Sequence, residues 1–193
     1  YFVISKYITI NGTPCVLELV SRLNEGRWID ANGSRFLLDR TRGEDMQLFL
    51  DPLTNVYSRR YFETYRTHLE GMEGVALRDV NNFKPINDRC GHAAGDAALR
   101  DIANAVRSCI RKTDILIRYG GDEFLLLFPR MTMEAFLDKK KQIQQAVRGI
   151  RMSEFADVQL SDSIGGIWGI HPITEAIRKT DYMMYQDTAE QKS

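Results

Sequence analysis

Two apolar runs joined by a pair of glycines constrain the fold of this chain most. Residues 115–119 and 123–128 are rich in Ile, Leu and Phe, and Gly120-Gly121 lies between them. Apolar runs of this length around a glycine turn are typical of a strand, a tight turn and a returning strand. The sequence therefore predicts an antiparallel pair of strands in this region.

Helical and strand patterns alternate around this pair from Asp51 onward. Asp51-Pro52 marks the boundary, because Asp favours an N-cap and Pro the first helical position. The predicted helices are 58–69, 96–110, 133–150 and 173–185, and the further strands are 75–77 and 158–168. We expect an α+β fold with one central, mostly antiparallel β-sheet flanked by helices.

The first fifty residues have a different sequence pattern from the residues that follow Asp51. Residues 7–10 and 15–20 are apolar and β-branched, and Asn11-Gly12 between them is a strong hairpin signal. Residues 35–50 form a candidate helical connector broken by Gly43. We therefore divide the chain into an N-terminal β-hairpin with connector at 1–50 and a main domain at 51–193.

Composition excludes several classes of protein. Lys plus Arg and Asp plus Glu each number 26, so the net charge is zero, which argues against a nucleic-acid binder. No apolar run approaches the roughly 18 residues that span a membrane, so we expect no membrane contact from this chain. Three widely spaced cysteines indicate no disulfide framework and fit a reducing cytoplasm. The chain starts at Tyr1 and not at Met, which suggests a piece of a longer protein.

Acidic residues follow the apolar strands. Asp79 comes directly after one strand, and Asp122-Glu123 lies in the glycine turn. Carboxylates held at strand ends can chelate Mg²⁺, and Lys84 could meet a phosphate. This combination suits phosphoryl or nucleotidyl transfer. The alternative is a solvated turn without a metal.

The segment Tyr119-Gly120-Gly121-Asp122-Glu123-Phe124 resembles the signature of GGDEF domains, the diguanylate cyclases. Four further blocks resemble the same family in order and spacing. They are Asp51–Thr54 with Arg59–Phe62, Asp79–Lys84 with Asn87-Asp88, Gly91-His92 with Gly95-Asp96, and Ser163–Gly165 with Asp181–Tyr185. The resemblance extends from Asp51 to the C-terminus.

The resemblance implies a fold related to the palm of nucleotide cyclases and polymerases. It also implies a reaction in which two GTP molecules condense into cyclic di-GMP, a bacterial second messenger, with release of pyrophosphate. Each subunit would bind one GTP, so two subunits of a homodimer would face each other. Mg²⁺ or Mn²⁺ would neutralise the phosphates and the developing alkoxide.

The resemblance also implies roles for individual residues. Asp79, Asp122 and the Val80 carbonyl would bind the metal, and Glu123 would be the acidic residue tied to catalysis. Asn82, Phe83 and Lys84 would cradle the terminal phosphates, Asn87 and Asp96 would read guanine, and Lys192 would be the basic residue after the last helix. Two alternatives stay open: Asp96 could cap the helix that it begins, and Asn87 could be a turn residue.

Arg111-Lys112-Thr113-Asp114 resembles the family's inhibitory RxxD site for cyclic di-GMP. Its position just before the strand that leads into the glycine turn agrees with the family. The planar guanidinium of Arg111 suits phosphates and a guanine edge. The alternative is a solvated helix end.

Several positions depart from the family pattern, among them Asn55 and Ser58. Asn81 stands where a second Asp is common, and Thr188 where a Lys usually meets GTP phosphates. Arg78 stands where an apolar strand residue is expected, and it could pair with a carboxylate and compete with the metal. Losing one charge-assisted phosphate contact would cost about 1.5–3 kcal/mol of binding.

The sequence thus favours a diguanylate cyclase at the C-terminal end of a sensor protein. We expect it in the cytoplasm, whether the whole sensor is membrane-bound or not, and slow if the fragment is monomeric. The alternative is a catalytically silent module that binds GTP or cyclic di-GMP as a receptor or dimerisation element. Trp168 and the cluster Tyr182–Tyr185 are expected to serve packing.

Overall fold

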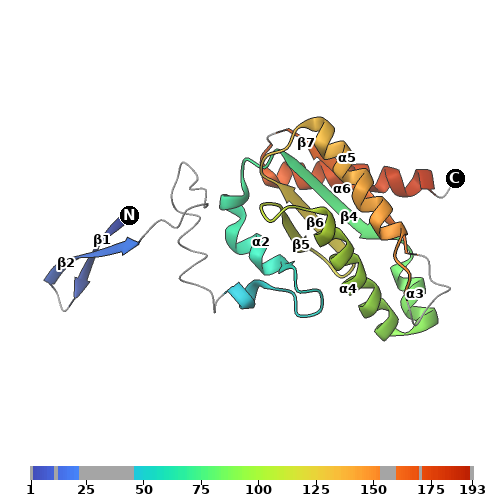
Figure 1. The fold of residues 1–193 in the computed structure, drawn as a ribbon, viewed down its shortest axis with the longest axis horizontal. Coiled ribbons are helices and arrows are strands. Elements are labelled where there is room, and N and C mark those ends of the chain that lie inside the picture. Colours follow the sequence, from blue (N-terminus) through green and yellow to red (C-terminus); the bar gives the residue numbers. More distant parts are fainter. Residues whose placement is uncertain (1, 11–12, 22–45, 153–159, 170, 192–193) are drawn as a thin grey trace. The chain divides into compact units, whose positions relative to one another are not determined.

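The computed structural model describes residues 2–10, 13–21, 46–152, 160–169 and 171–191 (Figure 1). Contacts divide the chain into two units, Tyr1–Gly43 and Glu44–Ser193. In the first unit, β1 (Phe2–Ile10) pairs with β2 (Thr13–Ser21) in antiparallel register, as the hairpin signal predicted. Of the expected connector, the structure describes the 3₁₀ turn η1 (Met46–Phe49) and Leu50, and the remainder lies outside the described residues.

The second unit is built around a five-stranded sheet. Its order is β3-β5-β6-β4-β7, and all neighbours are antiparallel except β3 and β5. The strands are β3 (Tyr57–Ser58), β4 (Gly74–Val80), β5 (Ile115–Arg118), β6 (Glu123–Phe128) and β7 (Asp162–Trp168). The mostly antiparallel α+β fold expected from the sequence is confirmed.

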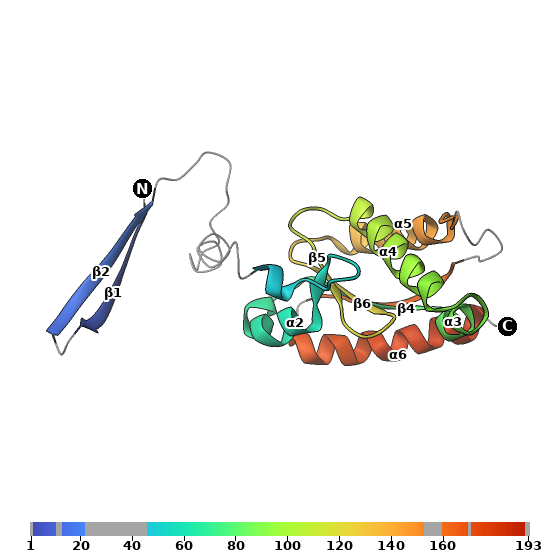
Figure 2. The same ribbon diagram turned by 90° about the horizontal axis from the view of Figure 1, so that it is seen from below.

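Helices cover both faces of this sheet (Figure 2). They are α2 (Arg59–Tyr65), followed by the 3₁₀ turn η2 (Arg66–Leu69), then α3 (Phe83–Cys90), α4 (His92–Cys109), α5 (Met133–Arg148) and α6 (Ile173–Gln191). Helices α4 and α5 lie on one face, and α2 and α6 on the other. None of the described helices is long and apolar enough to cross a bilayer.

Strand alternation decides which residues reach each face. Along β4, Ala76 and Val80 pack in the core under α4 and α5, whereas Val75 and Leu77 pack in the core above α6. Because successive side chains of a strand point to opposite faces, Asp79 belongs to the α6 face. This parity places the candidate metal ligand away from the α4 side of the sheet.

The structure corrects several boundaries. The sequence did not predict α3 or the short parallel pairing of β3 with β5. Asp51 does not cap a helix, because 52–54 form a turn in which Thr54 donates to the Asp51 carboxylate from its amide (2.9 Å) and hydroxyl (2.6 Å). Helix α4 begins at His92, so the alternative that Asp96 caps it is wrong.

Replacing Gly165 by Ala is expected to destabilise the domain by about 3 kcal/mol. A Cβ at this position of β7 would overlap the Thr180 carbonyl oxygen and the Met184 amide of α6, so the helix would have to move off the sheet. Chemical denaturation measures the loss. Gly121→Ala is the matched control, because a Cβ there meets nothing within 4 Å. Equal stabilities of the two variants would contradict the close approach of α6 to β7.

Candidate functional site

Three acidic residues meet where β4 ends and β6 begins. Asp79 lies directly opposite Glu123 in the antiparallel register. The Val80 amide donates to the Asp122 carbonyl oxygen (3.3 Å), so the residue before β6 is also held against the end of β4. The pairing of the two strands therefore gathers the three residues that the sequence singled out for metal binding and catalysis.

The electrostatics of this cluster show that its charges are costly. Burial, Asp122 and Glu123 together raise the pKa of Asp79 to about 6. Burial, Asp122 and Asp181 raise the pKa of Glu123, and the positive charge of Arg59 partly offsets them. A bound cation would relieve this repulsion. Within the described residues no group of three or more His, Cys, Asp or Glu side chains forms a complete metal cage. One or two carboxylates plus ligand phosphates are the usual shell of Mg²⁺, so the residues fit that ion.

Replacing Asp79 by Asn is expected to stabilise the metal-free protein above about pH 7. The pKa of Asp79 rises from 3.8 to about 6 on folding, so the folded state holds the proton more tightly. The stability contributed by this preference is complete below about pH 4 and is lost as the pH rises through 6. An unscreened rise of this size corresponds to about 3 kcal/mol. Solvent screening of a half-buried group leaves about 1 kcal/mol.

Thermal unfolding in the presence of a chelator measures this effect. The Asp79→Asn variant should unfold about 2–4 °C above the wild type at neutral and higher pH. The difference should disappear near pH 4. Asp138→Asn on α5, an exposed carboxylate, serves as the control and should change nothing at either pH. A gain that is equal at both pH values would show that ionisation of Asp79 is not its cause.

The glycine turn is held in place by its own backbone and by Arg118. The amides of Tyr119 and Gly120 both donate to the Glu123 carbonyl oxygen (2.8 and 3.2 Å). The Glu123 carboxylate lies over Gly120, where a Cβ would collide with it. Arg118 donates to the Gly121 carbonyl oxygen (2.7 and 3.1 Å) and to the Asp51 carboxylate (3.1 and 3.2 Å). The sequence analysis did not predict these hydrogen bonds of Arg118.

The segment expected to cradle phosphates lies beside the acidic residues. Asn82 has a positive φ of 58° and is followed directly by the first turn of α3. The side chains of Asn82 and Lys84 are exposed, whereas Phe83 packs against the core. The first amides of a helix have no intrahelical acceptor, so this end of α3 can bind phosphate oxygens next to Asp79.

The residues expected to read guanine lie close together at the junction of α3 and α4. The Asn87 amide oxygen contacts Gly95 so closely that a Cβ there would overlap it. Asp96 is the next residue and its side chain is exposed. The structure thus places Asn87 close to Asp96, through the contact with Gly95.

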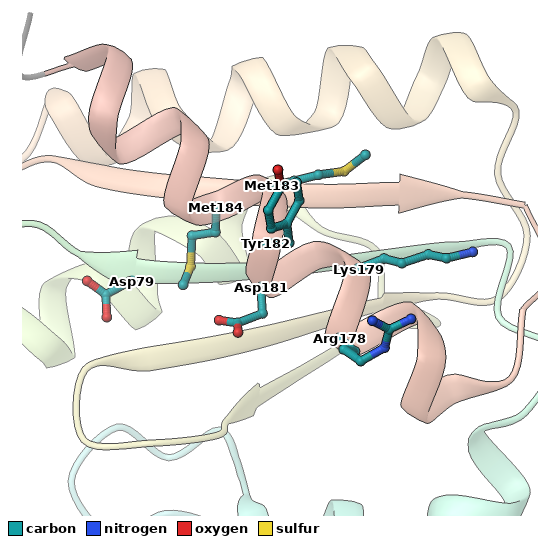
Figure 3. A pocket seen from close by; sticks show the side chains of 7 residues that line it. All are labelled: Asp79, Arg178, Lys179, Asp181, Tyr182, Met183 and Met184. Atoms are coloured by element: carbon teal, nitrogen blue, oxygen red, sulfur yellow. The ribbon is translucent and has the colours of Figure 1, made fainter.

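Helix α6 contributes a carboxylate that the sequence analysis did not assign. Asp79 and Asp181 line one cavity of about 730 Å³ on the α6 face, and Figure 3 shows both carboxylates directed into it. Met184 is buried as expected, but Tyr182 is 66% and Met183 44% exposed, so the expectation that these two serve packing is wrong. The distance between Asp181 on α6 and Asp79 on β4 is set by how the helix packs on the strand. The resemblance singled out the segment Asp181–Tyr185, but it did not assign a role to the Asp181 carboxylate.

Arg78 does not compete for the metal ligands. Its side chain is on the α4 face, fully buried, and its Nη2 lies 3.1 Å from Oδ2 of the equally buried Asp162 on β7. The guanidinium also lies 5.8 Å from the ring of Phe124. On the other face of the same strands, the Ser163 hydroxyl donates to the Asn81 side-chain oxygen (2.9 Å). The expected pairing of Arg78 with a carboxylate is confirmed, with Asp162 as the partner. The expected competition for the metal ligands is wrong, because alternation along β4 separates Arg78 from Asp79.

The RxxD segment lies at the opposite end of the sheet. It connects α4 with the first residue of β5, whereas the acidic cluster lies at the first residue of β6. Asp114 is buried and its carboxylate accepts from the Arg111 amide (2.8 Å), while the Arg111 side chain is exposed. A cavity of about 430 Å³ adjoins both residues, together with Arg107 and Lys112. Lys192 lies outside the described residues.

These features define a class of α+β domain that gathers carboxylates from two central strands beside a helix N-terminus. The family described as "Diguanylate cyclase, GGDEF domain" matches residues 48–193, so the chain belongs to the GGDEF domain family of diguanylate cyclases.

Individual relatives agree with this assignment. Diguanylate cyclase DgcM of Escherichia coli (strain K12) is 31% identical over 144 residues, which are 70% of this chain and 35% of DgcM. The solved GGDEF domain of TpbB (YfiN) from Pseudomonas aeruginosa (PAO1) is 31% identical with a TM-score of 0.63, covering 73% of this chain and 89% of that one. Diguanylate cyclase SiaD, solved with its activator SiaC from P. aeruginosa, is 27% identical with a TM-score of 0.67, covering 83% and 67%. The chain thus spans about a third of the curated relative DgcM.

Proposed function

We propose that this chain is a diguanylate cyclase that condenses two GTP molecules into cyclic di-GMP and two pyrophosphates. The observation that carries the proposal is the meeting of Asp79, Asp122 and Glu123 at the ends of β4 and β6, next to the first turn of α3. Carboxylates beside a phosphate-binding helix end suit a metal nucleotide. Since GTP is its substrate, we place the reaction in the cytoplasm.

In this proposal each group has a defined task. Asp79 and Asp122, with the Val80 carbonyl, would hold Mg²⁺, and the ion would neutralise charge on the phosphates. The first amides of α3 and the Lys84 ammonium bind the terminal phosphates. Asn87 and Asp96 orient the guanine through its donor and acceptor edge.

We assign to Glu123 the role of accepting the proton of the attacking hydroxyl. Its pKa is raised by burial and by its acidic neighbours, which makes it a better proton acceptor than an ordinary carboxylate. The 3′-hydroxyl of one GTP attacks the α-phosphorus of the other, and pyrophosphate leaves. Because each subunit holds one GTP, two copies of the chain must face each other in a homodimer.

Incubation with GTP and Mg²⁺ at high protein concentration tests the proposal. Chromatography should show cyclic di-GMP and pyrophosphate, with a rate that rises faster than linearly with protein concentration because two subunits must meet. Omission of the divalent cation is the control. A folded protein that consumes no GTP at any concentration would contradict the proposal.

A second candidate is a receptor that binds cyclic di-GMP without making it. The first observation that favours it is the cavity beside Arg111 and Asp114. The second is that Asn81, which stands where the family commonly has a second Asp, uses its side-chain oxygen to accept a hydrogen bond from Ser163. Calorimetry with cyclic di-GMP distinguishes the two candidates when combined with the turnover assay. A receptor binds the dinucleotide but forms none from GTP.

A further inference from the structure

A cavity of about 810 Å³ at the end of the sheet opposite the acidic cluster has no assigned role. It is bounded by the end of β7, the loop after β6 and the first turn of α5. Its walls include Trp168, Met133, Glu134, Arg130 and Arg111. Because Arg111 also lines the 430 Å³ cavity of the RxxD segment, the two cavities share a wall.

Trp168 forms a fixed aromatic surface in this cavity. Its side chain is 43% exposed, contrary to the expectation that it serves packing. Nevertheless its indole Nε1 donates to the Met131 carbonyl oxygen (2.7 Å). Glu73 fastens the same region, because its carboxylate accepts from the Met131 amide (2.6 Å) and its carbonyl accepts from the Gly169 amide (2.7 Å). An aromatic ring held in this way can stack on a planar ligand without losing further side-chain entropy.

Two guanidinium groups face the same space. The side chains of Arg111 and Arg130 are exposed, and in the described part of the chain neither has an ion-pair partner. Guanidinium groups bind phosphate oxygens through paired hydrogen bonds. Exposed Met133 adds an apolar border, and exposed Glu134 offers a carboxylate that can accept two N–H bonds from a guanine edge.

A stacking surface, phosphate-binding cations and a carboxylate together match the chemistry of a guanine nucleotide. We propose that Trp168, Arg130 and Glu134 form a guanine-nucleotide subsite that shares Arg111 with the RxxD segment and holds one base of cyclic di-GMP. The identification of the ligand as cyclic di-GMP rests on the proposed function. The exposure of the Trp168 ring and its hydrogen bond to Met131 do not depend on it.

Tryptophan fluorescence tests the subsite directly. The chain has two tryptophans, so a Trp28→Phe background leaves Trp168 as the reporter. Titration with cyclic di-GMP should quench its emission in a saturable manner. In calorimetry, Trp168→Leu and Arg130→Ala should each weaken cyclic di-GMP binding about tenfold. Arg100→Ala, an exposed arginine of α4 outside both cavities, is the matched control and should bind as the wild type does.

A conservative variant separates stacking from a structural role. Trp168→Phe keeps a stacking ring but loses the N–H bond that holds it to the Met131 carbonyl oxygen, so it should lose less affinity than Trp168→Leu. Thermal unfolding of both variants shows whether the fold is intact. Wild-type affinity in Trp168→Leu and Arg130→Ala, or cyclic di-GMP binding without quenching, would overturn the subsite. Absence of any cyclic di-GMP binding would overturn it as well, and the separate turnover assay shows whether the proposed function fails with it.

Discussion

The Asp122→Asn variant is expected to lose about 100- to 1,000-fold in the rate of cyclic di-GMP formation. Its backbone carbonyl, which accepts from the Val80 amide, is retained, so the position of the turn should not change. The substitution removes one negative charge just before the start of β6, next to Asp79. Steady-state turnover with GTP and Mg²⁺ measures the effect.

Two controls make this result specific. Asp138→Asn, an exposed carboxylate on α5, should leave turnover unchanged. Cyclic di-GMP affinity of the Asp122→Asn variant should equal that of the wild type, because the RxxD segment lies at the other end of the sheet. Turnover within a factor of two of the wild type would remove Asp122 from the metal site.

Asp162→Asn is expected to cost about 3–5 kcal/mol of unfolding free energy. It leaves the guanidinium of Arg78 fully buried without the negative charge that lies 3.1 Å away. Burial alone lowers the pKa of Arg78, and the charge of Asp162 opposes this effect, so loss of the partner exposes the whole desolvation cost. Chemical denaturation measures the change.

A double variant distinguishes pairing from packing. Arg78→Leu combined with Asp162→Val replaces both charges with apolar groups in a core already formed by Phe124 and its neighbours. The attraction within a buried ion pair is about equal to the free-energy cost of removing both charges from water. We therefore expect the unfolding free energy of this double variant to be within about 1 kcal/mol of the wild-type value or above it. If the double variant were as unstable as the single one, the pair would not be the reason for the loss.

Local sequence patterns were sufficient to predict those elements whose determining interactions join residues close together in the chain. Gly120-Gly121 between apolar runs predicted β5, the turn and β6, and the structure confirms them. The same holds for Asn11-Gly12 between β1 and β2. Local reasoning failed for α3, whose eight residues include Pro85 and few apolar positions. It also failed for the start of α4, because His92 lies about two turns before Leu99, the first large apolar residue of this helix.

The candidate site shows the same division. The types of residue in the signature indicated a cation and a phosphate, because hard cations prefer carboxylates whatever the fold. Register was needed to show that Asp79 faces Glu123 and that Arg78 does not face either. Packing of α6 on β4 was needed to bring Asp181 into the cavity with Asp79.

The amino-acid sequence alone was enough to predict most of the helices and strands, their alternation, and the chemical class of the acidic residues. These follow from turn residues and apolar periodicity, which act between near neighbours in the chain. The three-dimensional packing was needed to show that Arg78 pairs with Asp162, that Trp168 and Arg111 line the same cavity, and that Asp181 lines a cavity with Asp79. Such contacts depend on the order of strands in the sheet and on the helix that packs on each face. That order is set by burial of the whole core and not by any local segment.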